Sequence, residues 1–174
     1  MSMRRGYIQV YTGNGKGKTT AALGLALRSV GAGFRVFIAQ FIKKRRCSEH
    51  ILLDELRDRV TVKQYGTGFL LGKKPTKAAV QAARTGYDEV RNVLLSQEYD
   101  VVILDEANVA VRYGLITAQE LLDLMALKPK KVELVITGRY ADDQVMQAAD
   151  LVTEMREIKH YAKEGVTARR GIEK

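Results

Sequence analysis

Short apolar runs alternate with longer amphipathic stretches along the whole chain. Two of the runs, at residues 35–40 and 101–104, are apolar at nearly every position. Such runs are typical of strands that are buried on both faces of a parallel sheet. The remaining predicted strands are shorter or alternate between apolar and polar residues, and they lie at 7–11, 60–65, 132–137 and 151–159.

Helical patterns occupy the segments between these strands. Apolar residues recur with helical spacing over residues 76–97. Thr117 and Glu120 have the spacing of a capping box, which predicts a helix that starts there and runs to about Leu127, before Pro129. The other predicted helices lie at 18–30, 48–56 and 142–149, and the tail from Tyr161 is predicted to be irregular.

Strands and helices alternate without internal repeats, low-complexity segments or a linker. This order predicts a three-layer α/β fold with a mostly parallel central sheet, formed by residues 1–174 as one domain. Ligands in such folds bind at the carboxyl ends of the strands. Gln40, the pair Asp105 and Glu106, and Arg139 all follow predicted strands, so we expect them at one edge of the sheet.

A glycine-rich segment, Tyr-Thr-Gly-Asn-Gly-Lys-Gly-Lys-Thr-Thr at residues 11–20, joins the first predicted strand to the first predicted helix. Backbone N–H groups in such a loop can surround a phosphate group, and the helix dipole adds positive charge. We expect Lys18 to reach the terminal phosphate oxygens and the Thr19 hydroxyl to ligate Mg²⁺. The expected nucleotide-binding residues are Gly13, Asn14, Gly15, Lys16, Gly17, Lys18, Thr19 and Thr20.

The loop departs from the strict pattern G-x-x-x-x-G-K-S/T. That pattern requires a glycine at position 12, where this chain has Thr12, and counted from Gly13 the loop is one residue short. The alternative is a glycine-rich turn without a ligand. The strand–loop–helix context favours nucleotide binding and a P-loop NTPase-like, RecA-like form of the α/β fold. How the nucleotide lies stays open.

The apolar run at 101–104 ends in Asp105 and Glu106. A carboxylate at this position in a P-loop protein holds Mg²⁺ directly or through water, so both are candidate metal ligands. Glu106 could instead polarise a water molecule in a hydrolase, and the pattern does not separate the two roles. Arg139 is a candidate for neutralising phosphate charge. The alternative for Asp105 and Glu106 is that they are surface acids at the end of a strand. The alternative for Arg139 is a surface ion pair.

The chain has 29 basic and 20 acidic residues and a net charge of +9, which attracts polyanions. The basic clusters are dispersed and no aromatic residues alternate with them, so nothing specific points to nucleic acid. No apolar run approaches the about 20 residues that span a bilayer, and no signal peptide is visible, so a cytoplasmic protein is expected. The single cysteine, Cys47, and the residues His50 and His160 have no partners at metal-binding spacing.

Taken together, these motifs resemble the ATP:corrinoid adenosyltransferases of the P-loop type, the cob(I)alamin adenosyltransferases. The likeness extends from about residue 7 to residue 173. It is carried by the phosphate loop and by these segments: 40–43 (Gln-Phe-Ile-Lys), 66–69 (Gly-Thr-Gly-Phe), 104–106 (Leu-Asp-Glu), 136–139 (Ile-Thr-Gly-Arg) and the ending with Lys159, His160, Gly165, Val166, Ala168 and 171–173 (Gly-Ile-Glu).

The resemblance implies a reaction of cobalamin biosynthesis or salvage. A Co(I) corrinoid attacks the C5′ carbon of ATP, and triphosphate leaves. The resemblance also implies that Lys18 and Mg²⁺ stabilise charge on the triphosphate, that Asn14 orients the nucleoside, and that Thr19 and Glu106 hold the metal. A general P-loop NTPase or kinase, and a RecA-like nucleic-acid-binding ATPase, remain as alternatives.

In the family, an aromatic-bearing loop covers the lower face of the corrin. Here residues 66–72 would form this loop: Phe69 matches the first aromatic, and Leu71 stands where the family has a tryptophan. A reduced flavoprotein as electron donor and a homodimer are further implications of the resemblance.

Overall fold

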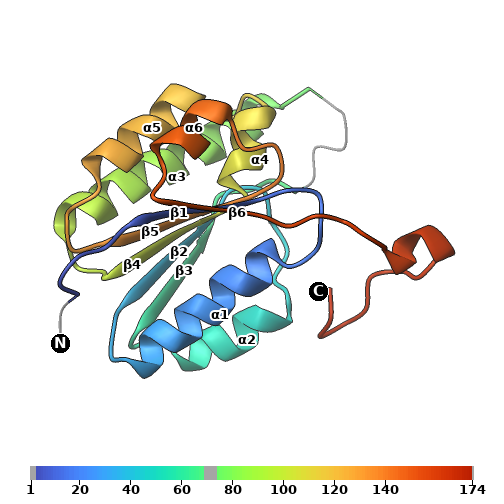
Figure 1. Cartoon of the computed structure of the whole chain (residues 1–174), viewed down its shortest axis with the longest axis horizontal. Coiled ribbons are helices and arrows are strands. Elements are labelled where there is room, and N and C mark those ends of the chain that lie inside the picture. Colours follow the sequence, from blue (N-terminus) through green and yellow to red (C-terminus); the bar gives the residue numbers. More distant parts are fainter. Residues whose placement is uncertain (1–2, 69–73, 174) are drawn as a thin grey trace.

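The computed structural model describes residues 3–68 and 74–173, and six parallel strands form its central sheet (Figure 1). The spatial order of the strands is β3-β2-β4-β5-β1-β6. Every neighbouring pair is parallel, which confirms the predicted α/β fold. The strands are β1 (Ile8–Thr12), β2 (Val36–Gln40), β3 (Val60–Gln64), β4 (Val101–Asp105), β5 (Glu133–Thr137) and β6 (Leu151–Glu154).

Helices cover both faces of the sheet and complete three layers. Helices α1 (Lys18–Gly31) and α2 (Ser48–Glu55) lie on one face (Figure 1). The opposite face carries α3 (Lys77–Ser96), α4 (Ala107–Arg112), α5 (Ala118–Leu127) and α6 (Asp143–Ala148). Within the described ranges, none of these helices is long and apolar enough to cross a membrane.

The central strands explain the continuous apolar runs of the sequence. All five residues of β2, β4 and β5 are buried, because each strand has a neighbour on both sides and helices on both faces. Side chains along β4 alternate between the two layers. Val102 and Leu104 join the core under α3 and α5, whereas Val101 and Ile103 join the core under α1.

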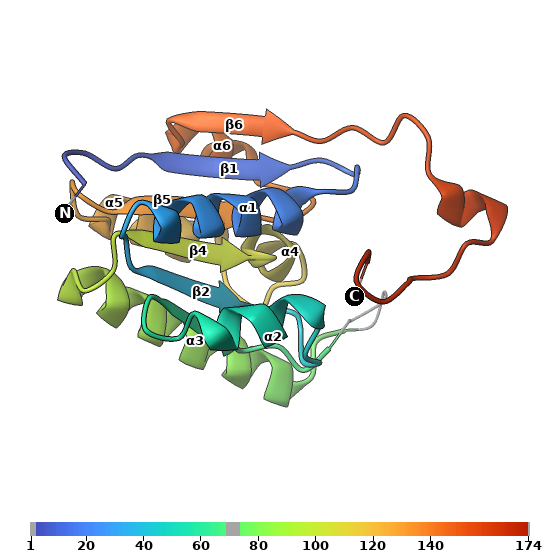
Figure 2. The same ribbon diagram turned by 90° about the horizontal axis from the view of Figure 1, so that it is seen from below.

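The last strand is shorter than predicted. The sequence pattern indicated a strand over residues 151–159, but β6 ends at Glu154. β6 is an edge strand that pairs only with β1, and Glu154 lies opposite Thr12, the last residue of β1. Because β1 turns there into the phosphate loop, β6 has no strand left to pair with. The chain then extends away from the sheet to a short 3₁₀ helix, Tyr161–Glu164 (Figure 2).

Helix α4 was not predicted. It has only six residues, and unlike the equally short α6, which Asp142 caps, it has no side-chain N-cap that would mark its start. It begins directly after Glu106, whose backbone adopts the left-handed conformation with φ of 61°. This turn separates the two acidic residues: Asp105 ends β4, and Glu106 precedes α4.

Candidate nucleotide-binding site

A cleft of about 690 Å³ lies beside the phosphate loop at the carboxyl edge of the sheet. Residues 15–20 line it, together with side chains from α1, α2 and the C-terminal tail. Gly13 and Asn14 precede this stretch and are not among the lining residues. The other lining residues are Leu23, Gly24, Leu27, Lys43, Ser48, Glu49, Glu106, Arg139, His160, Gly171, Ile172 and Glu173.

The glycines of the loop have a role that the sequence did not reveal. The chain that follows β6 passes directly against them, and a Cβ atom on Gly15 would lie 2.8 Å from the carbonyl oxygen of Met155. The Gly15 N–H donates to that oxygen at 2.6 Å. Gly13 also has a positive φ of 91° and would meet the same oxygen. These two glycines therefore allow Met155 to support the loop, in addition to shaping it around a ligand.

Lys18 is folded back onto the loop. Its Nζ donates to the carbonyl oxygens of Gly13 at 2.8 Å and Gly15 at 2.6 Å, and the residue is buried. Burial lowers the pKa of Lys18, and the positive charge of Arg139 lowers it further, while Glu106 opposes both effects. A phosphate group in the cleft would add a second negative charge near this buried ammonium group, beside that of Glu106.

Asp105 is fully engaged in hydrogen bonds. Its Oδ1 accepts the hydroxyl of Thr19 at 2.8 Å and the hydroxyl of Thr137 at 2.9 Å. Its Oδ2 accepts Nε2 of Gln40 at 3.1 Å and lies 3.3 Å from Nζ of Lys43. With only 2% of its surface exposed, Asp105 faces these four donors and is not among the residues that line the cleft.

Glu106 is the carboxylate of this pair that lines the cleft. Its backbone N–H donates to Oγ1 of Thr137 at 3.0 Å, which fixes the turn into α4. Burial and the neighbouring Asp105 raise the pKa of the Glu106 carboxyl, while Lys43, Lys18 and Arg139 lower it. A further positive charge, from a cation in the cleft, would favour the ionised form of Glu106.

Arg139 also lines the cleft, as predicted from its place after β5. Gly138, which precedes it, has φ of 131°, and a Cβ atom there would lie 3.1 Å from the backbone nitrogen of Val109. The glycine thus lets the chain turn tightly against α4 and brings Arg139 to the cleft.

The C-terminal tail forms a wall of the cleft that the sequence pattern did not indicate. Nζ of Lys16 donates to the carbonyl oxygen of Ile172 at 3.0 Å and lies 3.9 Å from the Glu173 carboxylate. Glu173 is in turn held by the Tyr161 hydroxyl and by Arg169, whose backbone N–H lies 2.8 Å from Oε2. The tail therefore first extends away from the sheet and then returns to contact the phosphate loop.

Phe69 and Leu71, the predicted corrin-covering residues, lie outside the described residues. The described start of their segment packs on the end of β2. A Cβ atom on Gly66 would lie 2.1 Å from the carbonyl group of Ile42, and the Gly68 N–H donates to the Ile42 oxygen at 3.1 Å. Close packing against Ile42 therefore explains the glycine at position 66.

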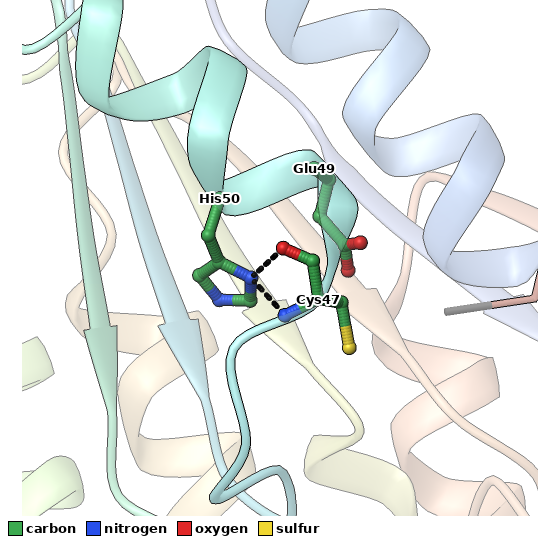
Figure 3. A group of neighbouring side chains, drawn as sticks. All are labelled: Cys47, Glu49 and His50. Carbon is green, nitrogen blue, oxygen red and sulfur yellow. Dashed lines mark hydrogen bonds between the residues drawn. The ribbon is translucent and has the colours of Figure 1, made fainter. Parts of the chain in front are cut away.

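Cys47, Glu49 and His50 lie together at the start of α2, with potential ligand atoms within 4.8 Å of one another (Figure 3). From the spacing in the sequence, Cys47 and His50 were expected to have no metal-binding partners. The Cys47 N–H always carries its proton, so Nδ1 of His50, 2.9 Å away, accepts it, and the Cys47 carbonyl oxygen at 3.3 Å is a secondary contact. A neutral imidazole has one lone pair, and here it caps a helix. This hydrogen bonding opposes metal binding at the group.

The local structure has the features of a P-loop fold: a glycine loop at a helix N-terminus, a buried lysine folded on it, and a threonine bonded to a strand-end aspartate. The fold agrees with that class. A KaiC-like protein from the hyperthermophilic archaeon Pyrococcus horikoshii superposes with a TM-score of 0.58 and 15% identity, over 89% of this chain and 75% of that one.

The sequence comparisons identify the family within this class. Residues 4–173 match the model of the family described as ATP:corrinoid adenosyltransferase BtuR/CobO/CobP. A corrinoid adenosyltransferase from Pseudomonas aeruginosa is 32% identical over 97% of this chain and 84% of its own length. One from Escherichia coli is 36% identical over 97% of this chain and 86% of its own length. The chain belongs to the ATP:corrinoid adenosyltransferase family.

Proposed function

We propose that the protein transfers the 5′-deoxyadenosyl group of ATP to the Co(I) centre of a corrinoid in the cleft beside the phosphate loop. The observation that carries the proposal is the family match over residues 4–173, together with the meeting of Lys18, Thr19 and Glu106 at one cleft. Transferase activity also characterises the named relatives.

The reaction requires charge stabilisation and no general base. The cobalt electron pair forms the Co–C bond, the bond between C5′ and its oxygen breaks, and that bond pair leaves on the triphosphate. Lys18, which is buried against the loop, would offset the growing negative charge, and Arg139 would add a second positive group. Asn14, exposed at the start of the loop, is proposed to orient the nucleoside.

The donor set suits Mg²⁺, which prefers oxygen ligands. Thr19 and Glu106 would hold the ion. The Thr19 hydroxyl donates a hydrogen bond to Asp105 and keeps its lone pairs for the metal, and Glu106 lines the cleft. Asp105 would act indirectly, since its oxygens already accept four donors. A bound Mg²⁺ would add positive charge beside the triphosphate.

Three further parts of the proposal come from the family. Phe69 and Leu71 would cover the lower face of the corrin, a reduced flavoprotein would supply electrons, and the active form would be a homodimer. The net charge of +9 suits a flavoprotein partner of acidic surface.

The test is an anaerobic assay with ATP, Mg²⁺ and a chemically reduced corrinoid, followed by visible absorbance and by separation of the phosphate products. The proposal requires a light-sensitive Co–C product and one triphosphate for each corrinoid converted. Release of orthophosphate or diphosphate without a Co–C product would refute it in favour of a general P-loop NTPase or kinase.

A further inference from the structure

A chain of hydrogen bonds connects the start of α2 to the end of β4. The Cys47 N–H donates to Nδ1 of His50 at 2.9 Å (Figure 3). Nε2 of His50 lies 2.9 Å from Oε1 of Gln40, and Nε2 of Gln40 donates to Oδ2 of Asp105 at 3.1 Å. Asp105 accepts the hydroxyl of Thr19 on its other oxygen. His50, Gln40 and Asp105 are each at most 4% exposed.

The direction of this chain is determined at its first bond. Because Nδ1 of His50 accepts a backbone N–H, its ring proton is on Nε2, and Nε2 donates to Gln40. Gln64 also donates to Oε1 of Gln40, at 3.0 Å. Two donors facing the same atom establish that it is the oxygen, so the amide nitrogen of Gln40 must point to Asp105.

We propose that His50 is a positioning residue for the nucleotide site and acts through Gln40 on Asp105. This inference rests on the proposed function, since it assigns a role to Asp105 in holding Thr19 for Mg²⁺·ATP. The two nitrogens of the His50 ring have separate roles. Nδ1 caps α2, and Nε2 orients the Gln40 amide.

The physical reason lies in the surroundings of Asp105. Without the Gln40 donor, the one partner that Oδ2 keeps among the described residues is Lys43, whose Nζ also lies 3.4 Å from Glu49. The carboxylate would then turn toward Lys43, and Oδ1 would leave the position in which it receives Thr19. An unpaired polar group is costly inside a protein, so removal of one member disturbs the other members of a buried hydrogen-bond network.

Two substitutions separate the cap from the positioning role. His50→Asn keeps an acceptor near the place of Nδ1 and removes the donor to Gln40, whereas His50→Gln keeps a donor near the place of Nε2 and disturbs the cap. The proposal predicts that His50→Asn impairs the site and that His50→Gln retains it. If His50 served only as a cap, the order of the two variants would be reversed.

The main readout is nucleotide binding without turnover, measured by calorimetry with ATP in excess Mg²⁺ and with ATP in chelator. Removal of an outer-shell partner costs about 10–100-fold in metal affinity or activity. His50→Asn should lose affinity for Mg²⁺·ATP in that range and keep its affinity for metal-free ATP, and His50→Gln should remain within about threefold of wild type for both. Equal losses for both nucleotide forms, or an unaffected His50→Asn, would overturn the proposal.

A spectroscopic measurement tests the same idea on the unaltered protein. The chain has two histidines, so the ¹⁵N signals of His50 can be assigned by comparison with His160→Gln. The proposal requires neutral His50 with its proton on Nε2. A proton on Nδ1 would contradict the chain of bonds. This result does not depend on catalysis, so it judges the proposal even if the wild-type protein forms no Co–C product and the proposed function fails.

A double substitution tests whether His50 and Gln40 act along the same chain of hydrogen bonds. Gln40→Met removes the donor to Asp105 and should reproduce the loss of Mg²⁺·ATP affinity seen with His50→Asn. Because both residues act along one chain, the double variant should bind no more weakly than Gln40→Met alone. Additive losses would show that His50 acts by another route.

Discussion

The hydroxyl of Thr19 donates to Oδ1 of Asp105 at 2.8 Å, which joins the first residues of α1 to the end of β4 across 86 positions of sequence. Strand β5 lies between β1 and β4, and its last residue, Thr137, donates to the same oxygen at 2.9 Å. Asp105 thereby holds together the loop and two strand ends, and its loss should affect both stability and the site.

Asp105→Asn should destabilise the protein. The substituted side chain keeps its shape but loses its charge, and its amide group must face at least one of the four donors. In the part of the chain that the structure describes, Lys43 would then be paired with Glu49 alone. Removing one partner of a buried ion pair costs on the order of 3 kcal/mol. Urea unfolding followed by circular dichroism would measure the loss, and a free energy of unfolding equal to that of the wild type would contradict this reading.

Lys18→Ala should abolish turnover and leave the fold intact. Within the described residues the ammonium group donates only to loop carbonyl oxygens, whereas the proposed reaction uses its charge to stabilise the leaving triphosphate. Removal of one such preorganised group costs about 10²–10³ in kcat. Lys131→Ala, an exposed lysine, is the control for the same change in net charge. Undiminished turnover by Lys18→Ala would refute the site.

Glu106→Gln should raise stability while it removes activity. Burial and Asp105 raise the pKa of the Glu106 carboxyl, so the folded protein binds this proton more tightly than the unfolded chain does. The stabilisation that comes from this raised pKa is therefore fully present below the pKa of Glu106 in the unfolded chain. It is lost as pH rises through the pKa of Glu106 in the folded protein. At neutral pH without Mg²⁺, the neutral amide should stabilise by on the order of 0.5–2 kcal/mol.

The measurement is the free energy of unfolding against pH for wild type and Glu106→Gln. The two curves should approach each other toward low pH and separate as pH rises. A constant difference over the whole range would show that the carboxyl has no shifted pKa.

Elements with a strong local signal were predictable from the sequence. The capping box of Thr117 and Glu120 is present, with both reciprocal hydrogen bonds, because it depends only on residues three apart. The buried strands β2 and β4 were predicted because they are apolar throughout. The sequence predicted a common site for Lys18, Thr19 and Glu106, because parallel strands bring their carboxyl ends to one edge of the sheet.

Features that depend on contacts between distant segments were not predictable. Met155 lies against Gly15 because β6 pairs with β1, and no local pattern shows this pairing. Lys43 was part of the 40–43 segment that resembles the family, but no sequence pattern indicated its contact with Asp105. The return of Ile172 to Lys16 follows an irregular segment, in which neither a helical nor a strand period guides the prediction.

Glu173→Gln should release the tail from the phosphate loop. The Arg169 and Tyr161 side chains lower the pKa of the Glu173 carboxyl to about 2, compared with about 4.3 in an unfolded chain. The stabilisation from the ionised Glu173 carboxylate is therefore fully present above its pKa in the unfolded chain. It is lost as pH falls through its pKa in the folded protein. At neutral pH the amide loses its charge-assisted bonds to Arg169 and its attraction to Lys16. Trypsin should then cut faster after Arg169 and Arg170, as followed by intact mass.

Glu164→Gln is the matched control, because Glu164 pairs with an exposed lysine, Lys159, at the outer end of the tail and such surface pairs contribute little. Bound ATP should change the cleavage rate in wild type more than in Glu173→Gln, since the wild-type tail lines the cleft. Equal cleavage of wild type and both variants would show that the tail is held by other contacts.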